Sequence, residues 1–388
     1  MDLDDFRWLL GADGQDLLFR SQAMVESGVP PLKAGERLRA AYDASRVAAA
    51  LSQVDLRTRA VAKFGDLAAL MYFTRDGLEQ ATRLQVADHR AGRMVAASPA
   101  SLVDLGCGIG GDLIAFSRAG ITVAGVDLDP MRVAIAQANL DALGLGGAVK
   151  EADATTLDTT AFAAVFVDPA RRTGAGRTFD VDAWTPPWTF VEQVLRGDAC
   201  VKVAPGIPHA LVPPGVEAEW VSDHGDVKEA ALWSGRLATT ARRATVLGSG
   251  GLATLTDEDD PGAEVRRVGQ YLYEPDGAVI RAGLVTALAA GVEGGLVDER
   301  IAYVTSDRSF RTPFGRGYEV VEELPFREKQ LKAALRERGI GRLTIKKRGV
   351  DVVPDELRKR LAPQGANEGT VVLTRVQDKA TALLVRPL

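Results

Sequence analysis

The stretch Asp104-Leu105-Gly106-Cys107-Gly108-Ile109-Gly110-Gly111 joins an apolar run, Ser101–Leu105, to a segment with helical periodicity. Glycines at such a junction let the backbone approach a ligand closely, and the following helix N-terminus offers unpaired N–H groups. Gly106, Gly108 and Gly110, with Gly111 directly after them, satisfy both the dinucleotide pattern G-x-G-x-x-G and the pattern D/E-x-G-x-G-x-G. The stretch therefore predicts a nucleotide-like ligand, but its glycine spacing does not identify that ligand.

Asp104 distinguishes between the two classes of ligand. A carboxylate two residues before the first glycine would repel the pyrophosphate of a dinucleotide. S-adenosylmethionine carries no phosphate; it carries a cationic sulfonium and an ammonium group, which a carboxylate favours. We therefore expect S-adenosylmethionine as the cofactor. An NAD-dependent oxidoreductase is the last-ranked alternative, since no His or Tyr is clearly placed as a proton donor beside a nicotinamide.

Two further acids follow successive predicted strands. Asp127 follows the run Thr122–Val126 and is placed to accept the two ribose hydroxyls of an adenosyl group, and it would suit NAD equally well. Asp153 follows the third strand and is placed to accept a hydrogen bond from the adenine amine. Ligands of open α/β sheets bind at these carboxyl ends of the strands, so Asp104, Asp127 and Asp153 together predict an adenosyl site.

Short apolar runs alternate with helical patterns from Ser101 onward. Four of the runs are typical of strands buried on both faces: Ser101–Leu105, Thr122–Val126, Ala163–Val167 and Cys200–Val203. Strands that alternate with helices of about 10–15 residues predict a parallel, doubly wound sheet. The fold class is therefore α/β.

The segments on either side of these strands have other patterns. Residues 1–97 show helical periodicity, with Thr74 as a helix N-cap, and predict an all-helical N-terminal domain. The sheet domain is expected over residues 98–256 and a small connecting α/β segment over residues 265–315. Residues 316–388 predict a compact α+β module with the order β-α-β-α-β-β.

Some elements within these segments are also predicted. Candidate antiparallel strands are Val227–Trp233, Ala244–Leu247 and Leu252–Leu255, and a helix is expected over Pro275–Leu288. The last two strands flank a Gly-Ser-Gly-Gly turn, which is typical of a hairpin.

The run Ala163–Val167 is followed directly by Asp168-Pro169-Ala170-Arg171-Arg172. With the features above, residues 101–204 resemble class I S-adenosylmethionine-dependent methyltransferases, which implies a Rossmann-like sheet. In such enzymes an Asp or Asn followed by Pro-Pro and an aromatic residue or Arg faces the target atom. The resemblance implies that Asp168, Pro169 and Arg171 belong to the catalytic site. Arg172 is predicted to bind the substrate. Ala170 and Arg171 depart from the string of base-amine methylases, in which an aromatic ring stacks on the base.

A wider resemblance covers most of the chain. The strings Phe73–Thr82 with His89-Arg90, Asp168–Arg172, Tyr271–Pro275 and Leu343–Arg348 resemble bacterial methyltransferases with a C-terminal THUMP-like domain. Genuine THUMP domains bind RNA, so the resemblance implies RNA (tRNA or rRNA) as the partner and RNA modification as the activity. A small-molecule methyltransferase and a non-catalytic protein that binds an adenosyl ligand or RNA remain alternatives.

The charge distribution agrees with an RNA partner. The net charge is −5, but residues 311–388 contain 17 Lys and Arg against 10 Asp and Glu. The basic runs of this module predict phosphate contacts by Lys346, Lys347 and Arg348. His89 and Arg90, on a helix before the sheet, are predicted to line the substrate entrance.

Other classes of function are disfavoured by composition. The three histidines stand apart from acids and thiols at metal-binding spacing, so we expect no metal. Cys107 and Cys200 are placed as structural residues rather than as nucleophiles. The longest uncharged stretch, Val203–Val216, contains four prolines, and the N-terminus is acidic, so we expect a cytoplasmic protein without a membrane span. The sequence leaves the oligomeric state open.

Overall fold

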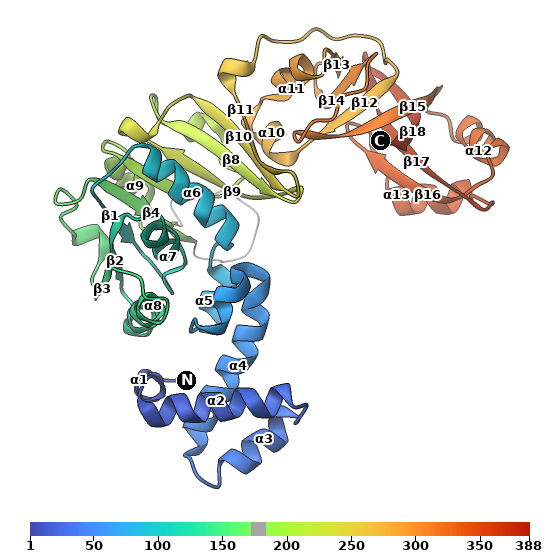
Figure 1. The fold of residues 1–388 in the computed structure, drawn as a ribbon. Helices are drawn as coiled ribbons and strands as arrows, with labels where there is room; N and C mark the ends of the chain where they lie inside the picture. Colours follow the sequence, from blue (N-terminus) through green and yellow to red (C-terminus); the bar gives the residue numbers. More distant parts are fainter. Residues whose placement is uncertain (172–183) are drawn as a thin grey trace. The chain divides into compact units, whose positions relative to one another are not determined.

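The computed structural model describes residues 1–171 and 184–388, which form two compact units (Figure 1). The first unit contains Met1–Val203, Pro213–Val216 and Leu232–Ala238. The second contains Ala204–Val212, Glu217–Ala231 and Thr239–Leu388. In the described ranges, no helix is both long and apolar enough to cross a membrane.

The N-terminal part of the first unit is helical, as predicted. Its helices are α1 (Leu3–Leu9), α2 (Ala12–Glu26), α3 (Pro31–Leu38), α4 (Ala44–Phe64), α5 (Arg75–Gln80) and α6 (Leu84–Ala96). Thr74 caps α5 as expected, because its side chain accepts a hydrogen bond from the Gly77 N–H at 3.0 Å. The cap fixes the direction in which the chain enters α5.

The rest of the first unit is a parallel sheet. Its strands are β1 (Ser101–Leu105), β2 (Thr122–Asp127), β3 (Ala148–Glu151), β4 (Ala164–Val167) and β7 (Ala199–Val203), in the order β7-β4-β1-β2-β3. The helices between them are α7 (Gly111–Arg118), α8 (Pro130–Ala142) and α9 (Trp188–Val194). Asp104 is paired in register with Gly125, and Leu105 with Val167. The predicted doubly wound sheet is confirmed, and its strand order brings the ends of β1, β2 and β4 together.

Four strands follow in the order β11-β10-β8-β9: β8 (Glu217–Asp223), β9 (Asp226–Trp233), β10 (Arg242–Gly248) and β11 (Gly251–Thr256). They belong to the second unit except for the last two residues of β9, which belong to the first. The hairpin predicted at the Gly-Ser-Gly-Gly turn is confirmed, because β10 and β11 pair antiparallel. β8 was not predicted as a strand, and it runs parallel to β10.

A seven-stranded sheet forms the rest of this unit, in the order β13-β14-β12-β15-β18-β17-β16. Its strands are β12 (Tyr271–Pro275), β13 (Gly295–Asp298), β14 (Ile301–Ser306), β15 (Gly315–Pro325), β16 (Ile340–Lys347), β17 (Asn367–Val376) and β18 (Lys379–Pro387). The expected boundary between residues 265–315 and 316–388 therefore divides one sheet, because β12 and β15 are hydrogen-bonded neighbours.

The single helix predicted over Pro275–Leu288 is divided into two helices in the structure and begins later. Pro275 ends β12, and two short helices follow, α10 (Gly277–Ala282) and α11 (Val285–Gly291). Gly283 separates them with a φ of +68°, a left-handed conformation that ends a helix.

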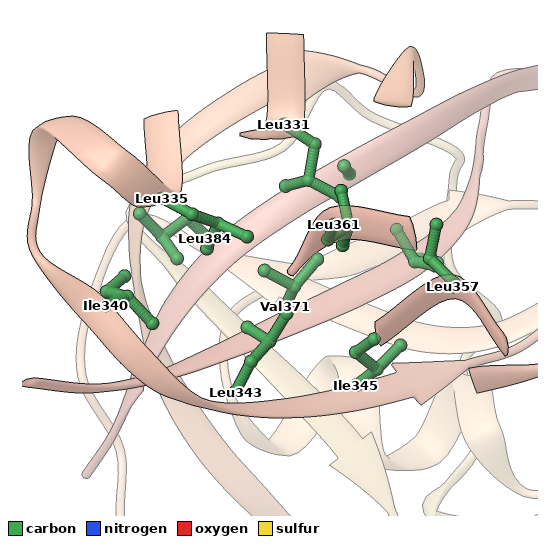
Figure 2. Packing of buried hydrophobic residues seen from close by; sticks show 11 residues of the cluster. Leu331, Leu335, Ile340, Leu343, Ile345, Leu357, Leu361, Val371 and Leu384 are labelled. Atoms are coloured by element: carbon green, nitrogen blue, oxygen red, sulfur yellow. The ribbon is translucent and has the colours of Figure 1, made fainter. Parts of the chain in front are cut away.

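Two helices cover one face of the C-terminal sheet, α12 (Glu328–Glu337) and α13 (Pro354–Leu361) (Figure 2). Leu331 and Leu335 of α12 pack with Leu357 and Leu361 of α13 in a buried apolar cluster. Strand residues complete it: Leu343 and Ile345 from β16, Val371 from β17 and Leu384 from β18. Since side chains alternate along a strand, Lys346 and Arg348 face away from this cluster.

Candidate active site

The glycine loop has the backbone geometry that its sequence predicts. Gly106, Gly108 and Gly110 have φ values of +90°, +57° and +83°, which L side chains rarely adopt. A Cβ at Gly110 would also lie 3.2 Å from the Cβ of Ala136. The loop is held to the end of β2, because the Gly106 N–H donates to the Val126 carbonyl at 2.8 Å. Side chains at these positions would therefore strain the backbone of the loop, and at Gly110 a side chain would also crowd the helix α8 (Pro130–Ala142).

Asp104 is a buried carboxyl group at the base of this loop. Its side chain is 1% exposed, and Oδ1 has no hydrogen-bond partner among the described residues. Burial raises the pKa of Asp104 well above its usual value, and the nearby carboxylates of Asp112 and Asp168 raise it further. An unsatisfied buried carboxyl oxygen is costly unless a ligand donates to it. The position thus fits a cationic group, as in the ammonium of S-adenosylmethionine.

Asp127 is the last residue of β2 and is 7% exposed. Its Oδ2 accepts from the Gly108 N–H at 3.0 Å, and its Oδ1 accepts from the Asp129 N–H at 3.0 Å. The carboxylate therefore joins the glycine loop to the end of β2. A carboxylate has about four acceptor sites, so these two bonds leave capacity for ribose hydroxyls.

Asp153 occupies a different environment from the other acids. It is exposed, and its Oδ1 accepts from the Thr155 N–H at 2.8 Å and from the Thr155 hydroxyl at 2.7 Å. These bonds lower the pKa of Asp153. The residue forms the turn after β3, and its contact with an adenine stays a prediction.

Asp168 follows β4 and is brought next to the glycine loop. A Cβ at Gly106 would lie 4.0 Å from the Asp168 carbonyl oxygen. Lys202, on the neighbouring strand β7, donates to Asp168 Oδ2 at 2.6 Å and to the Thr82 hydroxyl at 3.0 Å. The exposed fractions of the Lys202 and Asp168 side chains are 17% and 33%. The carboxylate is thus fixed at one oxygen and is still accessible.

The polar contacts continue from Thr82 into the interior. The Thr82 hydroxyl donates to Asp112 Oδ2 at 3.1 Å, and the Arg90 guanidinium donates to Asp112 Oδ1. Arg90 is 1% exposed, and its guanidinium carbon lies 4.7 Å from the centre of the Phe166 ring. The expectation that Arg90 lines a substrate entrance is therefore corrected: its ion pair with Asp112 holds it inside the unit. His89 is half-buried.

The helical segment before the sheet is fixed against the glycine loop. The buried Asn139 amide accepts from the Tyr72 N–H at 2.6 Å and donates to the Ile109 carbonyl at 2.9 Å. A Cβ at Gly77 would lie 2.4 Å from Ile109 Cγ2, so only glycine allows this approach of α5 to the loop. The string Phe73–Thr82 is thus part of the site's framework.

Lys63 fixes the end of α5, just before Thr82. Its Nζ donates at 2.7–2.8 Å to the carbonyl oxygens of Leu78, Glu79 and Ala81. Burial lowers the pKa of Lys63 to about 8, and the nearby cations Lys202 and Arg83 contribute to the same shift. The ammonium satisfies carbonyl groups that a helix end leaves without intrahelical partners.

The other predicted site residues are those that follow Asp168 and the basic residues of the second unit. Pro169 is buried, and Arg171 belongs to the short strand β5 (Ala170–Arg171), but Arg172 lies outside the described residues. In the second unit, Lys347 is exposed, whereas Lys346 is half-buried with its Nζ 2.5 Å from Glu274 Oε2. Arg348 donates to the Ala302 carbonyl at 2.8 Å.

The two cysteines are buried. Burial raises the pKa of the Cys107 thiol well above its usual value, and the carboxylates of Asp104 and Asp127 add to this shift. Such a thiol is a poor nucleophile. Over the described ranges, no group of three or more His, Cys, Asp or Glu side chains is arranged to hold a metal ion.

Sequence reasoning missed Lys202, Thr82 and Asp112. Lys202 carries the only available signal, since it is a charged residue inside an otherwise apolar strand, β7. A buried strand keeps such a residue when its charge is paired. The partners of Thr82 and Asp112 depend on how α6 packs against α7, which no local pattern encodes.

Comparisons with known proteins agree with this geometry. Residues 102–170 match the model of a methyltransferase domain, residues 315–387 that of a THUMP domain-like family, and residues 2–60 that of a domain of unknown function. A protein of Mycobacterium tuberculosis (strain H37Rv), described as an uncharacterized S-adenosylmethionine-dependent methyltransferase, is 38% identical over 347 residues. The alignment covers 86% of this chain and 95% of that protein, and the counterpart in strain CDC 1551 matches equally.

A solved structure shares the fold. It comes from Porphyromonas gingivalis W83 and is described as a proposed methyltransferase. The TM-score is 0.74 at 23% identity, and the match covers 89% of this chain and 92% of that one. This likeness confirms the predicted fold class, and the relatives above confirm the predicted cofactor. The chain belongs to the class I S-adenosylmethionine-dependent methyltransferases that carry a THUMP-like domain.

Proposed function

We propose that this methyltransferase acts on RNA and that its THUMP-like module binds the RNA backbone. The observation that carries the proposal is a basic face on α12. Lys329, Lys332 and Arg336 are spaced three and four residues apart, so they lie on one side of the helix. All three are exposed, and none has an ion-pair partner among the described residues. Cations that are not neutralised by the protein are available to phosphates.

The opposite side of α12 explains why these cations face solvent. Leu331 and Leu335 are 1% and 2% exposed and pack into the cluster of Figure 2. The helix is therefore fixed by its apolar face, and its basic face has a defined orientation on the module. Lys347 adds an exposed cation on the edge strand β16.

The active site supports methyl transfer by positioning. S-adenosylmethionine supplies a methyl group on a sulfonium, which an acceptor lone pair takes as the carbon–sulfur bond breaks with its electrons on sulfur. Asp104 is assigned to the ammonium group, Asp127 to the ribose hydroxyls and Asp153 to the adenine amine. Asp168 is assigned to the acceptor, where its carboxylate orients the attacking atom and takes up the released proton. Lys202 holds this carboxylate through Oδ2.

The test uses total RNA from cells that lack the gene, incubated with the purified protein and isotopically labelled S-adenosylmethionine. Mass spectrometry of the nucleosides should show one labelled methylated nucleoside. The variant Asp168→Asn, which keeps the shape of the side chain, should give none. Absence of label from RNA, with label transferred to a small-molecule extract instead, would show that the substrate is not RNA.

The role of the basic face needs its own variant. The triple variant Lys329→Glu, Lys332→Glu and Arg336→Glu should lose RNA methylation while S-adenosylhomocysteine binding is unchanged. A cation away from α12 in the same C-terminal module provides the matched control. Lys379 is exposed at the start of β18, and the variant Lys379→Glu should methylate RNA normally. Equal loss in both variants would mean that overall charge matters, not this face.

A further inference from the structure

The second unit contains a cavity whose lining includes no residue of the matched methyltransferase domain, residues 102–170. Its volume is about 860 Å³. Four parts of the unit line it. Two are turns, one between β10 and β11 and one, His224-Gly225, between β8 and β9. The others are the segment Glu274–Gly277, where β12 leads into α10, and a group of cations from β15, β16 and the segment before β15. α10 packs against β8 and β10, so these walls belong to one packed region.

Four cations line one side of this cavity: Arg311, Arg316, Lys346 and Arg348. Lys346 and Arg348 are two residues apart at the end of β16 and therefore project from the same face. Lys346 is held by Glu274, and the Arg348 guanidinium is held by the Ala302 carbonyl and lies 5.1 Å from the centre of the Tyr303 ring. These two cations have fixed positions.

Arg311 and Arg316 provide charge that the protein does not neutralise. Both are exposed, and neither has an ion-pair partner in the part of the chain that the structure describes. Two carboxylates, Glu274 and Asp276, also line the cavity, so its four cations outnumber its acids by two. Glu274 Oε2 accepts from Lys346 and from the Tyr318 hydroxyl, and Asp276 accepts from the Ala278 N–H at the start of α10. The cavity is therefore positive.

The glycine turn forms the wall between β10 and β11 and carries almost no side chains. Gly248 and Gly251 are paired across the hairpin, with Ser249 and Gly250 as its two-residue loop. A Cβ at Gly248, Gly250 or Gly251 would meet no atom within 4 Å. Gly248 and Gly250 are thus not required for packing within the protein, whereas Gly251 has a φ of +96°, a backbone conformation that favours glycine. A bare backbone next to a positive cavity lets a sugar–phosphate chain approach closely and offers N–H donors to it.

We propose that this cavity binds a phosphate-bearing stretch of single-stranded RNA between the glycine turn and the cations. The proposal rests on the proposed function and adds a second contact surface to it, separate from the basic face of α12. Cations spread over three chain segments fit several successive phosphates better than one phosphate group. The volume is near the upper end of the range of small-molecule sites, about 300–1,000 Å³. A charged groove that follows the backbone is the usual way to hold single strands.

The test measures binding of a fluorescently labelled single-stranded RNA of about 12 nucleotides by anisotropy, at about 50 and 200 mM salt. The double variant Arg311→Glu with Arg316→Glu should bind at least about tenfold more weakly, and the slope of log affinity against log salt should fall by about two, one for each lost phosphate contact. Lys379→Glu, an exposed cation outside the cavity, should bind like the wild type.

A variant of the opposite wall makes the result specific. Gly250→Glu places a carboxylate beside the cavity at a position with open space around it, so it should fold normally and weaken binding as well. Wild-type affinity in both the double arginine variant and Gly250→Glu would overturn the cavity proposal and leave RNA methylation standing. A wild-type protein that neither binds nor methylates RNA would overturn the proposed function itself.

Discussion

The substitution Asp104→Asn should change stability and ligand binding in opposite directions. It keeps the shape of a side chain that is 1% exposed and removes its charge. The pKa of Asp104 is raised by burial and by the carboxylates of Asp112 and Asp168. A carboxyl group whose pKa is higher in the folded state stabilises the protein at low pH, and this contribution is lost as the pH rises through that pKa. Without ligand, the variant should therefore gain stability relative to the wild type as the pH rises.

Ligand binding should weaken because the ammonium group loses a charged acceptor. A hydrogen bond to a charged group contributes about 1.5–3 kcal/mol, which corresponds to about 10- to 150-fold in affinity. In the wild type, the bound ammonium favours the ionised carboxyl, so binding should release a proton at pH values below the raised pKa of Asp104. The variant should release none from this position.

Calorimetry with two ligands checks this reasoning. S-adenosylhomocysteine carries the ammonium group, whereas 5′-methylthioadenosine has the same nucleoside without it. Asp104→Asn should weaken binding of the first ligand and leave the second within about twofold, and titrations in buffers of different ionisation enthalpy report the proton. Equal losses for both ligands, or full affinity for S-adenosylhomocysteine, would refute the assignment of Asp104 to the ammonium.

Three other sites give distinct predictions. Asp127→Ala should weaken both ligands by about 1–3 kcal/mol, since both carry the ribose; unchanged calorimetric affinity would remove Asp127 from the ribose site. Lys202→Met should lower kcat by about tenfold or more while S-adenosylhomocysteine affinity is retained, because it frees the Asp168 carboxylate, which Lys202 holds at 2.6 Å. Lys202→Arg should recover part of the rate. A wild-type kcat in Lys202→Met would contradict a positioning role. Leu357→Ala should lower the free energy of unfolding by about 2–5 kcal/mol, as it empties a fully buried position in α13. Denaturant titration measures this loss, and the exposed Val353→Ala should change it little.

The strands and the glycine loop could be predicted because their signals are local. Ser101–Leu105 was predicted with its observed bounds. Asp104 and Asp127 could be predicted as site residues because they lie near the carboxyl ends of β1 and β2, next to the glycine loop. Burial of Asp104 and the bonds of Asp127 to the loop agree with these predictions. Their contacts with ligand atoms stay predictions.

The partners of the active-site residues could not be predicted in the same way. Arg90 lies on an amphipathic helix, and the sequence alone does not show which polar residue of such a helix is buried. Arg90 is buried because it contacts Asp112 and Phe166, which are distant from it in the sequence and come close to it only in the folded unit. Likewise, Lys346 belongs to a run of basic residues, which predicted a phosphate contact. Its ion pair with Glu274, 72 residues earlier in the chain, could not be predicted from that run.

The network from Arg90 to Asp168 connects the helical segment before the sheet with the strands of the sheet. The described residues between Met1 and Val203 all belong to the first unit. Thr82 comes from the helical part and contacts both Asp112 on α7 and Lys202 on β7. The segment before the sheet therefore supplies one of the groups that orient Lys202, and through it Asp168. A change at Thr82 should alter methyl transfer although this residue lies outside the matched methyltransferase domain, because the site is assembled from both sides of residue 97.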